Sequence, residues 1–197
     1  MRRIIVGISG ASGPQYGIRL LEVLKDFKNV ETHLVISEAA KLNIQLETDR
    51  TIEQVEALAH FTHSNSDLAA SIASGSFRTE GMVIAPCSVK TLSGLANSFN
   101  LNLLLRAGDV ILKEKKKLIL VFRETPLHLG HLRLLTQLAE VGAIIMPPVP
   151  AFYHNPKTIL DLIDHTIGKI LDQFGLEHQL FKRWKEPVPE GTGGLEL

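Results

Sequence analysis

The amino-acid sequence predicts a doubly wound α/β domain with a mostly parallel sheet, and three observations lead to this fold class. Short, unbroken runs of Val, Ile and Leu recur along the chain, as is typical of strands that are covered on both faces. Segments with the period of an amphipathic helix separate these runs. Polar turns follow several of the runs, and sheets of this kind bind ligands at the carboxyl ends of their strands. The alternation of strand and helix therefore predicts helices on both faces of one sheet.

The predicted strands and helices follow directly from these patterns. The strands are residues 3–9, 32–37, 82–87, 117–123 and 143–148, of which the last ends in a proline cluster. The first helix follows the first strand, since Ile18, Leu21 and Leu24 recur at helical spacing. Further helical patterns cover residues 103–112, 129–141 and 159–174.

Length and composition set limits on the class of protein. The 197 residues are enough for one domain, which we place at residues 1–184, followed by a flexible tail at 185–197 that is rich in Pro and Gly. Lys and Arg number 21, as do Asp and Glu, so the net charge of +0 argues against nucleic acid or a membrane surface as a partner. A single cysteine, no apolar run long enough to span a membrane and no signal-peptide pattern lead us to expect a cytoplasmic protein.

The first predicted strand leads into a glycine- and serine-rich turn, GISGASGPQYG. Its glycines, Gly7, Gly10 and Gly13, lack the G-x-G-x-x-G spacing of dinucleotide-binding proteins. Such a turn can still present backbone N–H groups and a helix N-terminus to an anion. The alternative is a capping box, in which Ser12 caps the helix and Gln15 bonds back to it. We favour ligand binding, because the turn lies at the carboxyl end of a strand.

A second polar turn, PCSVKT, follows the third predicted strand. The hydroxyl groups of Ser88 and Thr91, together with helix-start amides, make a plausible anion site, although an ordinary helix cap by Ser88 is the simpler interpretation. Cys87 ends an apolar strand with no basic partner in an obvious position, which favours a buried side chain over a nucleophile. The turn at Ser74 and Gly75 gains interest only if a second phosphate must be held.

Several basic and aromatic residues are candidates for an anionic ligand. Arg123 ends an apolar strand, where a guanidinium is costly unless it meets an anion. His128 and His131 share a helix face, but no third ligand is in view, so a metal site is the weaker interpretation. The other candidates are Arg106, Lys113, Lys169, Tyr153 and Trp184.

Taken together, these segments resemble the UbiX-type flavin prenyltransferases of the homo-oligomeric flavin-containing decarboxylase-like superfamily. The likeness runs from Arg3 to about Trp184, and the segments PCSVKT, RETPL and PAFYH are the most specific of it. The other matching segments are GISGASG, ETHLVIS, LETD, SGSF, RAGDVILKE, LHLGHL, ILDQFG and RW.

The resemblance implies a flavodoxin-like (Rossmann-like) three-layer sandwich that binds reduced FMN and dimethylallyl phosphate without a metal. It implies transfer of the dimethylallyl group to N5 and C6 of the flavin, with the prenylated FMN then serving a separate UbiD-type decarboxylase. It also implies a homo-oligomer, a dodecamer in this family. Whether the donor is the phosphate or the pyrophosphate is left open, because Lys169 stands where arginine is usual and Glu38 where lysine is common.

The resemblance also implies roles for individual residues. Glu47 and Glu124 would handle protons, with Lys113 and Trp184 as further catalytic residues, and the turn around Ser12 would position the flavin ring more than its phosphate. The residues that would bind FMN are Gly10, Ala11, Ser12, Ser37, Ser88, Val89, Lys90, Thr91 and Arg123. The residues that would bind the prenyl phosphate are Ser74, Gly75, Arg106, Lys113, Tyr153 and Lys169.

Two other functions remain as alternatives. A flavin-dependent cysteine-type decarboxylase of the same superfamily would share the fold and the flavin site. However, that branch carries an asparagine-containing motif where PCSVKT stands here, and the basic residues suit a phosphate better than a thiol. A non-catalytic flavin carrier subunit would bind FMN without modifying it.

Overall fold

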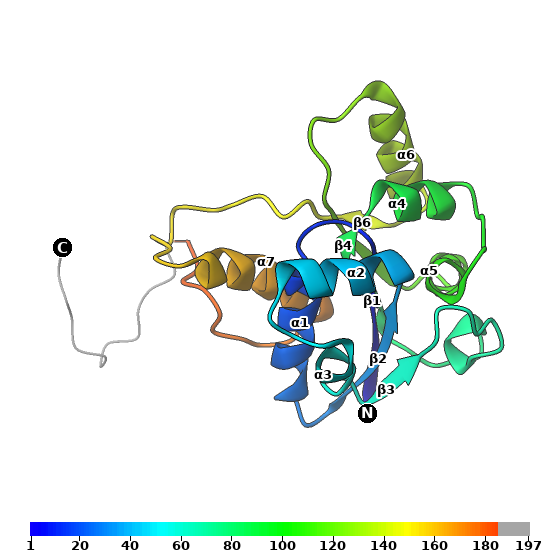
Figure 1. The fold of residues 1–197 in the computed structure, drawn as a ribbon. Coiled ribbons are helices and arrows are strands. Elements are labelled where there is room, and N and C mark those ends of the chain that lie inside the picture. Colours follow the sequence, from blue (N-terminus) through cyan, green and yellow to red (C-terminus); the bar gives the residue numbers. More distant parts are fainter. Residues whose placement is uncertain (185–197) are drawn as a thin grey trace. The chain divides into compact units, whose positions relative to one another are not determined.

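The structure is a computed structural model that describes residues 1–184, and the chain forms two compact units. One unit is Met1–Val149 and the other begins at Pro150 (Figure 1). The prediction of a single domain over residues 1–184 stays a prediction, and the predicted tail at 185–197 lies outside the described residues. No helix of residues 1–184 is both long and apolar enough to cross a membrane.

The first unit is built on one parallel sheet. Over the part of the chain that the structure describes, the sheet has six strands in the order β3-β2-β1-β4-β5-β6. Adjacent strands pair in parallel, for example Val6 with Leu34 on one side of β1 and with Val83 on the other. The strands are β1 (Arg2–Ile8), β2 (Val30–Ile36), β3 (Phe61–His63), β4 (Gly81–Cys87), β5 (Lys117–Phe122) and β6 (Ile144–Ile145).

Helices follow most of the strands, as the sequence pattern predicts. The predicted helices at 103–112, 129–141 and 159–174 are present within a residue or so of these bounds, which confirms the doubly wound class. The elements are α1 (Gln15–Lys25), α2 (Glu38–Glu47), α3 (Ile52–Glu56), the short 3-10 helix η1 (Ser71–Ala73), α4 (Val89–Ala96), α5 (Leu103–Lys113), α6 (Leu129–Glu140) and α7 (Ile159–Phe174).

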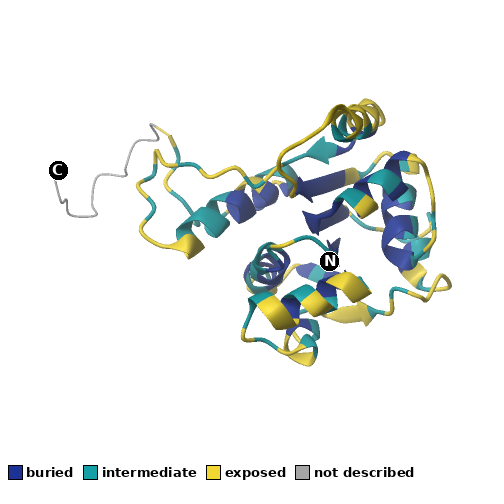
Figure 2. Cartoon of the chain, turned by 45° about the horizontal axis from the view of Figure 1, so that its top comes forward, coloured by how far each residue is buried: buried dark blue, intermediate teal, exposed yellow. Residues whose placement is uncertain are grey.

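Alternate residues of β1 show how the layers form. Ile8 meets α1, because a Cβ on Gly17 would lie 2.7 Å from Ile8 Cγ1. Gly7 points to the opposite face, where its Cβ would lie 3.4 Å from a methyl group of Leu104 on α5. Successive side chains of a strand point to opposite faces, so α1 and α5 cover opposite faces of the sheet. The strands and the inner faces of these helices hold the buried residues (Figure 2).

Some of the short elements are absent from the predicted pattern. β3 was not predicted, because Phe61, Thr62 and His63 are too few to show a period and its first two residues are exposed at the edge of the sheet. The fifth predicted strand is only two residues long in the structure, Ile144–Ile145. The strand order without β3 is β2-β1-β4-β5-β6, which is the flavodoxin-like arrangement.

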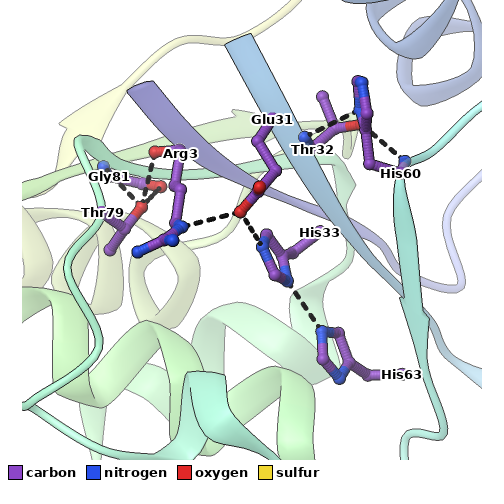
Figure 3. A network of polar contacts seen from close by, with 8 residues as sticks. All are labelled: Arg3, Glu31, Thr32, His33, His60, His63, Thr79 and Gly81. Carbon is purple, nitrogen blue, oxygen red and sulfur yellow. Dashed lines mark hydrogen bonds and ion pairs between the residues drawn. The ribbon is translucent and has the colours of Figure 1, made fainter. Parts of the chain in front are cut away.

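A polar network ties the edge strand β3 to β2 and β1 (Figure 3). Glu31 Oε1 accepts hydrogen bonds from Arg3 Nε at 2.6 Å and from His33 Nε2 at 3.1 Å. His33 Nδ1 and His63 Nε2 lie 2.9 Å apart, and their rings stack with a centroid distance of 5.2 Å. The ring of Phe61 also stacks on His33, so that β3 is held to β2 by side chains as well as by backbone pairing.

The second unit contains α7. A capping box starts this helix, since Thr158 accepts a hydrogen bond from the backbone of Asp161, whose side chain accepts one from the Thr158 backbone. Gly175 ends it in the left-handed conformation, with φ of 63°. The helix displays His165 and Lys169 one turn apart, and both are considered below.

Candidate functional site

A cavity of about 620 Å³ lies in the first unit, at the carboxyl ends of the strands. The order of the sheet reverses between β1 and β4, because the chain runs outward from β1 to β2 and β3 and then crosses to β4 on the other side. Such a switch point is where open α/β sheets bind their ligands. The cavity is lined by Gly10, Ala11, Ser12, Ser37, Glu38, Ala39, Asn65, Ser88, Val89, Lys90, Thr91, Leu101, Asn102, Leu105, Arg123 and Glu124.

The cavity brings together residues that are far apart in the sequence. The nine residues predicted to bind FMN all line it, as does Glu124. They come from the turns after β1, β2, β4 and β5, because the carboxyl ends of parallel strands meet at the same edge of a sheet. Their role in binding stays a prediction.

Three helices begin at the cavity, and each has a polar cap. Ser37 Oγ accepts a hydrogen bond from Ala40 N at 3.2 Å at the start of α2. Ser88 Oγ accepts from Thr91 N at 3.3 Å and donates to Thr91 Oγ1 at 3.1 Å at the start of α4. Asn102 caps α5 in the same way. Helix caps and anion sites both use the backbone N–H groups of a helix start. The Ser88 cap is formed and lines the cavity, so the helix-cap and anion-site interpretations of Ser88 are compatible.

The turn after β1 is held by Glu47 and not by a capping box. Ser12 Oγ donates to Glu47 Oε2 at 3.0 Å, and Gly13 N donates to the same oxygen at 2.8 Å. Gln15 Nε2 bonds to the backbone oxygen of Glu47 at 2.8 Å. The N-cap of α1 is Pro14, without a side-chain cap, so the capping-box interpretation of Ser12 and Gln15 was wrong. Instead of capping α1, the Ser12 hydroxyl and the Gln15 amide both donate to Glu47 at the end of α2.

Gly10 allows this turn to pack against α2. A Cβ placed on Gly10 would lie 2.4 Å from the Cβ of Ala39, which is closer than two carbon atoms can approach. Both residues line the cavity. Glycine is therefore required here by a close approach, and it brings the backbone of the turn to the wall of the cavity.

Two cationic side chains lie at the cavity. Arg123 follows β5 and is exposed, so the expected cost of a buried guanidinium does not arise; its position at the cavity is what links it to an anion. Its charge reaches Tyr16, where burial raises the pKa of the phenol and Arg123 partly offsets that rise. Lys90, in the first turn of α4, is also exposed and lines the cavity.

Cys87 is buried, as the apolar interpretation predicts. Burial raises the pKa of its thiol, so that the reactive thiolate is disfavoured. Next to it, Ser9 Oγ accepts from Ser88 N at 2.8 Å and donates to Pro86 O at 2.9 Å, which joins the ends of β1 and β4 below the cavity.

Four predicted substrate residues form a separate cluster, which we call the α5 cluster: Ser74, Gly75, Arg106 and Lys113. Arg106 Nε donates to Ala73 O at 3.1 Å, and a Cβ on Gly75 would lie 2.7 Å from Lys113 Nζ. The Lys113 ammonium also pairs with Glu114. None of the four is among the residues that line the cavity. The structure thus brings these residues together, but not at the predicted flavin site.

The remaining predicted residues belong to the second unit. Tyr153 Oη lies 3.1 Å from His165 Nε2, and the ring of Trp184 meets Tyr153 edge-on at 5.5 Å. Lys169 Nζ lies 3.7 Å from Asp172 Oδ2. Arg183 hydrogen-bonds to that carboxylate and is the main reason that its pKa is lowered. Tyr153, Lys169 and Trp184 are exposed.

The histidine pair at the start of α6 has a structural role. His128 Nδ1 accepts from Gly130 N at 3.0 Å, and the two rings of His128 and His131 stack at 3.6 Å. Within residues 1–184, no three His, Cys, Asp or Glu side chains are grouped as metal ligands.

Sequence reasoning missed part of the cavity wall. Asn65 follows β3, which was itself not predicted, and its side chain accepts from Leu104 N at 3.0 Å at the start of α5. Leu101 and Leu105 supply apolar surface, and Asn102 supplies the cap. The available signal was Asn102, a good N-cap residue directly before an apolar helical pattern.

The residues present fit a flavin mononucleotide. Ala11, Val89, Leu101 and Leu105 offer apolar surface for a flat ring. Hydroxyl groups, helix N-termini and the cation of Arg123 offer donors for a phosphate. A ligand with both an aromatic ring and a phosphate matches this division of the cavity.

Comparisons with known proteins agree with this geometry. Residues 1–172 match the family model described as Flavoprotein. The flavin prenyltransferase UbiX of Escherichia coli (strain K12) is 60% identical over 187 residues, which cover 94% of this chain and 99% of that protein.

Solved structures are similar over nearly the whole chain. A crystal structure of AnUbiX (PadA1) in complex with FMN and dimethylallyl pyrophosphate has a TM-score of 0.92 at 46% identity, covering 95% of this chain and 99% of that one. A dodecameric FMN-dependent UbiX-like decarboxylase from Escherichia coli O157:H7 has a TM-score of 0.91 at 48% identity, covering 93% and 100%. With this fold, this cavity and this degree of identity, the chain belongs to the UbiX family of flavin prenyltransferases.

Proposed function

We propose that the protein is a flavin prenyltransferase, which transfers a dimethylallyl group from dimethylallyl phosphate to N5 and C6 of reduced FMN. The observation that carries the proposal is the cavity at the switch point, where the turns after four strands and the start of α5 together supply an apolar wall, three helix N-termini and Arg123. The 60% identity to a flavin prenyltransferase supports the choice of reaction. The relative crystallised with FMN and dimethylallyl pyrophosphate supports the choice of ligands.

The cavity residues would divide the work of holding FMN. Ser88 to Thr91, at the start of α4, and Arg123 would bind the phosphate, since amides, hydroxyls and a guanidinium stabilise its charge. The turn Gly10 to Ser12 would lie against the ring, because Gly10 brings the backbone to the wall and Ser12 is fixed by Glu47. Ser37 would complete the site from the start of α2.

When bound, reduced FMN supplies the nucleophilic atoms, and no side chain of this chain needs to act as nucleophile. The protein's task is to position the two substrates and to stabilise the charge that develops on the departing phosphate. Two carboxylates would be the candidates to accept a proton: Glu47 at the end of α2, which bonds to the Ser12 turn, and Glu124, which lines the cavity. Glu47 Oε2 is fixed by two donors, and Glu124 Oε1 accepts from Thr125 N at 2.9 Å.

The donor phosphate would be bound by the α5 cluster together with Tyr153 and Lys169. Because the α5 cluster does not line the cavity of its own chain, we propose that a neighbouring copy supplies it. The 48% identical relative that is dodecameric supports such an assembly. Exposed apolar side chains on and around α6 offer a surface for it: Leu127, Leu129, Leu132 and Val141.

The product and its destination follow from the same proposal. Prenylated FMN would leave the protein and serve as the cofactor of a UbiD-type decarboxylase. We place this reaction in the cytoplasm. The chain's one cysteine, Cys87, is a buried thiol, as suits a reducing compartment.

The test is anaerobic incubation of the protein with reduced FMN and dimethylallyl phosphate, or the pyrophosphate, followed by mass spectrometry of the extracted flavin. We expect flavin that has gained one five-carbon unit. Bound but unmodified FMN with either donor would contradict the proposal and favour a flavin carrier. Release of carbon dioxide from a peptide with a C-terminal cysteine would favour the cysteine-type decarboxylase instead.

A further inference from the structure

The hydroxyl group of Tyr153 is within hydrogen-bonding distance of a histidine, His165. Tyr153 Oη lies 3.1 Å from His165 Nε2, and the two rings meet edge-on with a centroid distance of 5.7 Å. Tyr153 belongs to the segment before α7, whereas His165 belongs to the helix. Trp184 meets the tyrosine ring at 5.5 Å, also edge-on. His154 also meets the ring edge-on at 5.5 Å, so three aromatic rings contact Tyr153, and the His165 nitrogen contacts its hydroxyl.

His165 is itself held in a defined position. Its ring is parallel to that of His154 at 5.2 Å, with an interplanar angle of 9°, and Phe181 lies 4.6 Å away. Lys169 is one turn further along the same helix. Burial, and then the charges of His154 and Lys169, lower the pKa of His165. The charge of His154 contributes in turn to the lowered pKa of Asp161, one turn before His165.

We propose that His165 is a positioning residue for the donor phosphate: its Nε2–H donates to Tyr153 Oη, which turns the single hydroxyl hydrogen of Tyr153 toward the phosphate. This inference rests on the proposed function, in which Tyr153 and Lys169 meet the prenyl phosphate. His165 touches no substrate in this scheme and acts through Tyr153.

The direction of the hydrogen bond decides whether Tyr153 can serve a phosphate. A tyrosine hydroxyl has one hydrogen and accepts through its lone pairs. If Tyr153 donates to His165, only lone pairs are left for the substrate, and they repel an anion. If His165 donates, the hydroxyl hydrogen is available to a phosphate oxygen. An anion beside Tyr153 therefore selects the donating form of His165, either the Nε2–H tautomer or the imidazolium.

Helix α7 gives this arrangement a charged counterpart. Lys169 lies on the same face of the helix as His165. In the proposal, His165 orients the neutral hydroxyl of Tyr153 toward the phosphate, and Lys169 binds the phosphate with its own charge. Asp172 Oδ2, 3.7 Å from Lys169 Nζ, restrains the lysine but is shared with Arg183. The Tyr153 hydroxyl and the Lys169 ammonium would both bind the same chemical group, a phosphate monoester or diphosphate.

The test compares steady-state KM for dimethylallyl phosphate, kcat and FMN affinity across four proteins: wild type, His165→Phe, His165→Gln and Tyr153→Phe. In His165→Phe, Tyr153 is no longer oriented to donate to the charged phosphate. We expect the loss of that hydrogen bond to raise KM about tenfold, with little change in FMN affinity. His165→Gln keeps an N–H near Nε2 and should recover most of the loss. The double variant His165→Phe, Tyr153→Phe should be no worse than Tyr153→Phe alone, because the two residues act as a unit.

The pH dependence separates positioning from a merely structural role. The ratio of KM between His165→Gln and wild type cancels the titration of the phosphate itself. At low pH His165 is an imidazolium, which can only donate, so the advantage of the wild type over His165→Gln is greatest there. We therefore expect the ratio to fall as pH rises through the titration of His165. The groups facing His165 that contribute are Tyr153, His154, Lys169 and, through His154, Asp161. His60→Gln, in the first unit, is the matched control.

The outcomes are distinguishable. Wild-type protein that forms no prenylated flavin overturns the proposed function and this inference with it. Prenylation by the wild type with KM for His165→Phe within twofold of the wild-type value overturns the inference alone. A fall in kcat and FMN affinity at constant KM also overturns it, since that is the result of a structural role. If His165→Phe does not fold, the pH dependence of the KM ratio between His165→Gln and wild type still decides: a ratio that does not change with pH overturns the inference.

Discussion

Ser12 and Glu47 are joined by a 3.0 Å hydrogen bond that connects the turn after β1 to the last residue of α2. Gly13 N donates to the same carboxylate oxygen, so that two donors from one turn converge on one acceptor. Glu47 therefore has two separable tasks: it shapes the wall of the cavity, and in the proposed reaction it is a candidate proton acceptor.

Two substitutions at Glu47 separate these tasks. Glu47→Gln keeps an acceptor oxygen for Ser12 and Gly13, so we expect FMN affinity within a few-fold of wild type and a loss of at least tenfold in single-turnover prenylation if the carboxylate takes the proton. Glu47→Ala removes the acceptor, and FMN affinity should fall as well. Flavin fluorescence quenching measures the affinity, and rapid quench with mass spectrometry measures the turnover. Full prenylation by Glu47→Gln would assign the proton to Glu124.

Gly10 and Ala39 make a second, purely steric prediction. Gly10→Ala places two Cβ atoms 2.4 Å apart and should cost about 1–3 kcal/mol of stability or displace the turn, with weaker FMN binding. Ala39→Gly removes one of the two atoms, after which the new Cβ has its nearest contacts at 3.5 Å, the backbone of residue 39. The double variant should therefore recover FMN affinity, as measured by titration. No recovery would mean that the turn is fixed by something other than this contact.

Arg123 is the side chain whose removal should most weaken flavin binding. Arg123→Ala should raise the Kd for FMN by about tenfold or more, because a charge-assisted hydrogen bond to a phosphate is lost. The matched comparison is riboflavin, which has no phosphate: its Kd should change much less. Equal losses for FMN and riboflavin would place Arg123 against the ring and not against the phosphate.

The architecture was largely predictable from the sequence, because buried parallel strands are apolar runs and the first, third and fourth runs match β1, β4 and β5 closely. The cavity was predictable for the same reason, since its polar turns follow those runs directly. Asn65 was not, because β3 is three residues long and shows no period. The role of Glu47 toward Ser12 is a contact over 35 positions, and local capping rules pointed to Gln15 instead.

The α5 cluster leads to a prediction about mixed oligomers. If a neighbouring copy supplies Arg106 to the cavity that contains Arg123, the two defects lie in different chains. With FMN well below the raised Kd of Arg123→Ala, we expect Arg106→Ala and Arg123→Ala each to have little activity alone. Co-expressing or co-refolding the two variants should restore activity in those sites that combine an intact Arg106 from one chain with an intact Arg123 from the other. A matched mixture of Arg123→Ala with Glu124→Gln, whose positions share one cavity, should show no recovery. Recovery in neither mixture, from folded oligomers, would contradict a shared site.

The network of Figure 3 predicts how stability depends on pH. Burial is the main cause that lowers the pKa of His33 and of His63 below the ordinary value of 6.5. Glu31 partly offsets the shift of His33, whereas the charge of His33 lowers the pKa of His63 further. The folded protein therefore keeps both rings neutral, while the unfolded chain takes up protons as pH falls below about 6.5. Since the unfolded state then binds more protons, the free energy of unfolding falls on acidification through that range. The pKa of Glu31 is held low by His33 and then Arg3, and its contribution is lost only at more acidic pH.

Thermal unfolding between pH 5 and pH 8 measures this effect. We expect Tm to decline below pH 6.5, and His63→Gln to flatten the decline, because the amide can still donate to His33 Nδ1 but does not titrate. His60→Gln is the comparison variant: it removes an imidazole that bonds to Thr32 and whose charge is the smallest of the influences on the pKa of His33. The His33–His63 pair is the cause of the pH dependence only if the slope of Tm against pH is flatter in His63→Gln than in His60→Gln. Identical slopes in wild type and His63→Gln would show that the titration of His63 does not contribute to this pH dependence.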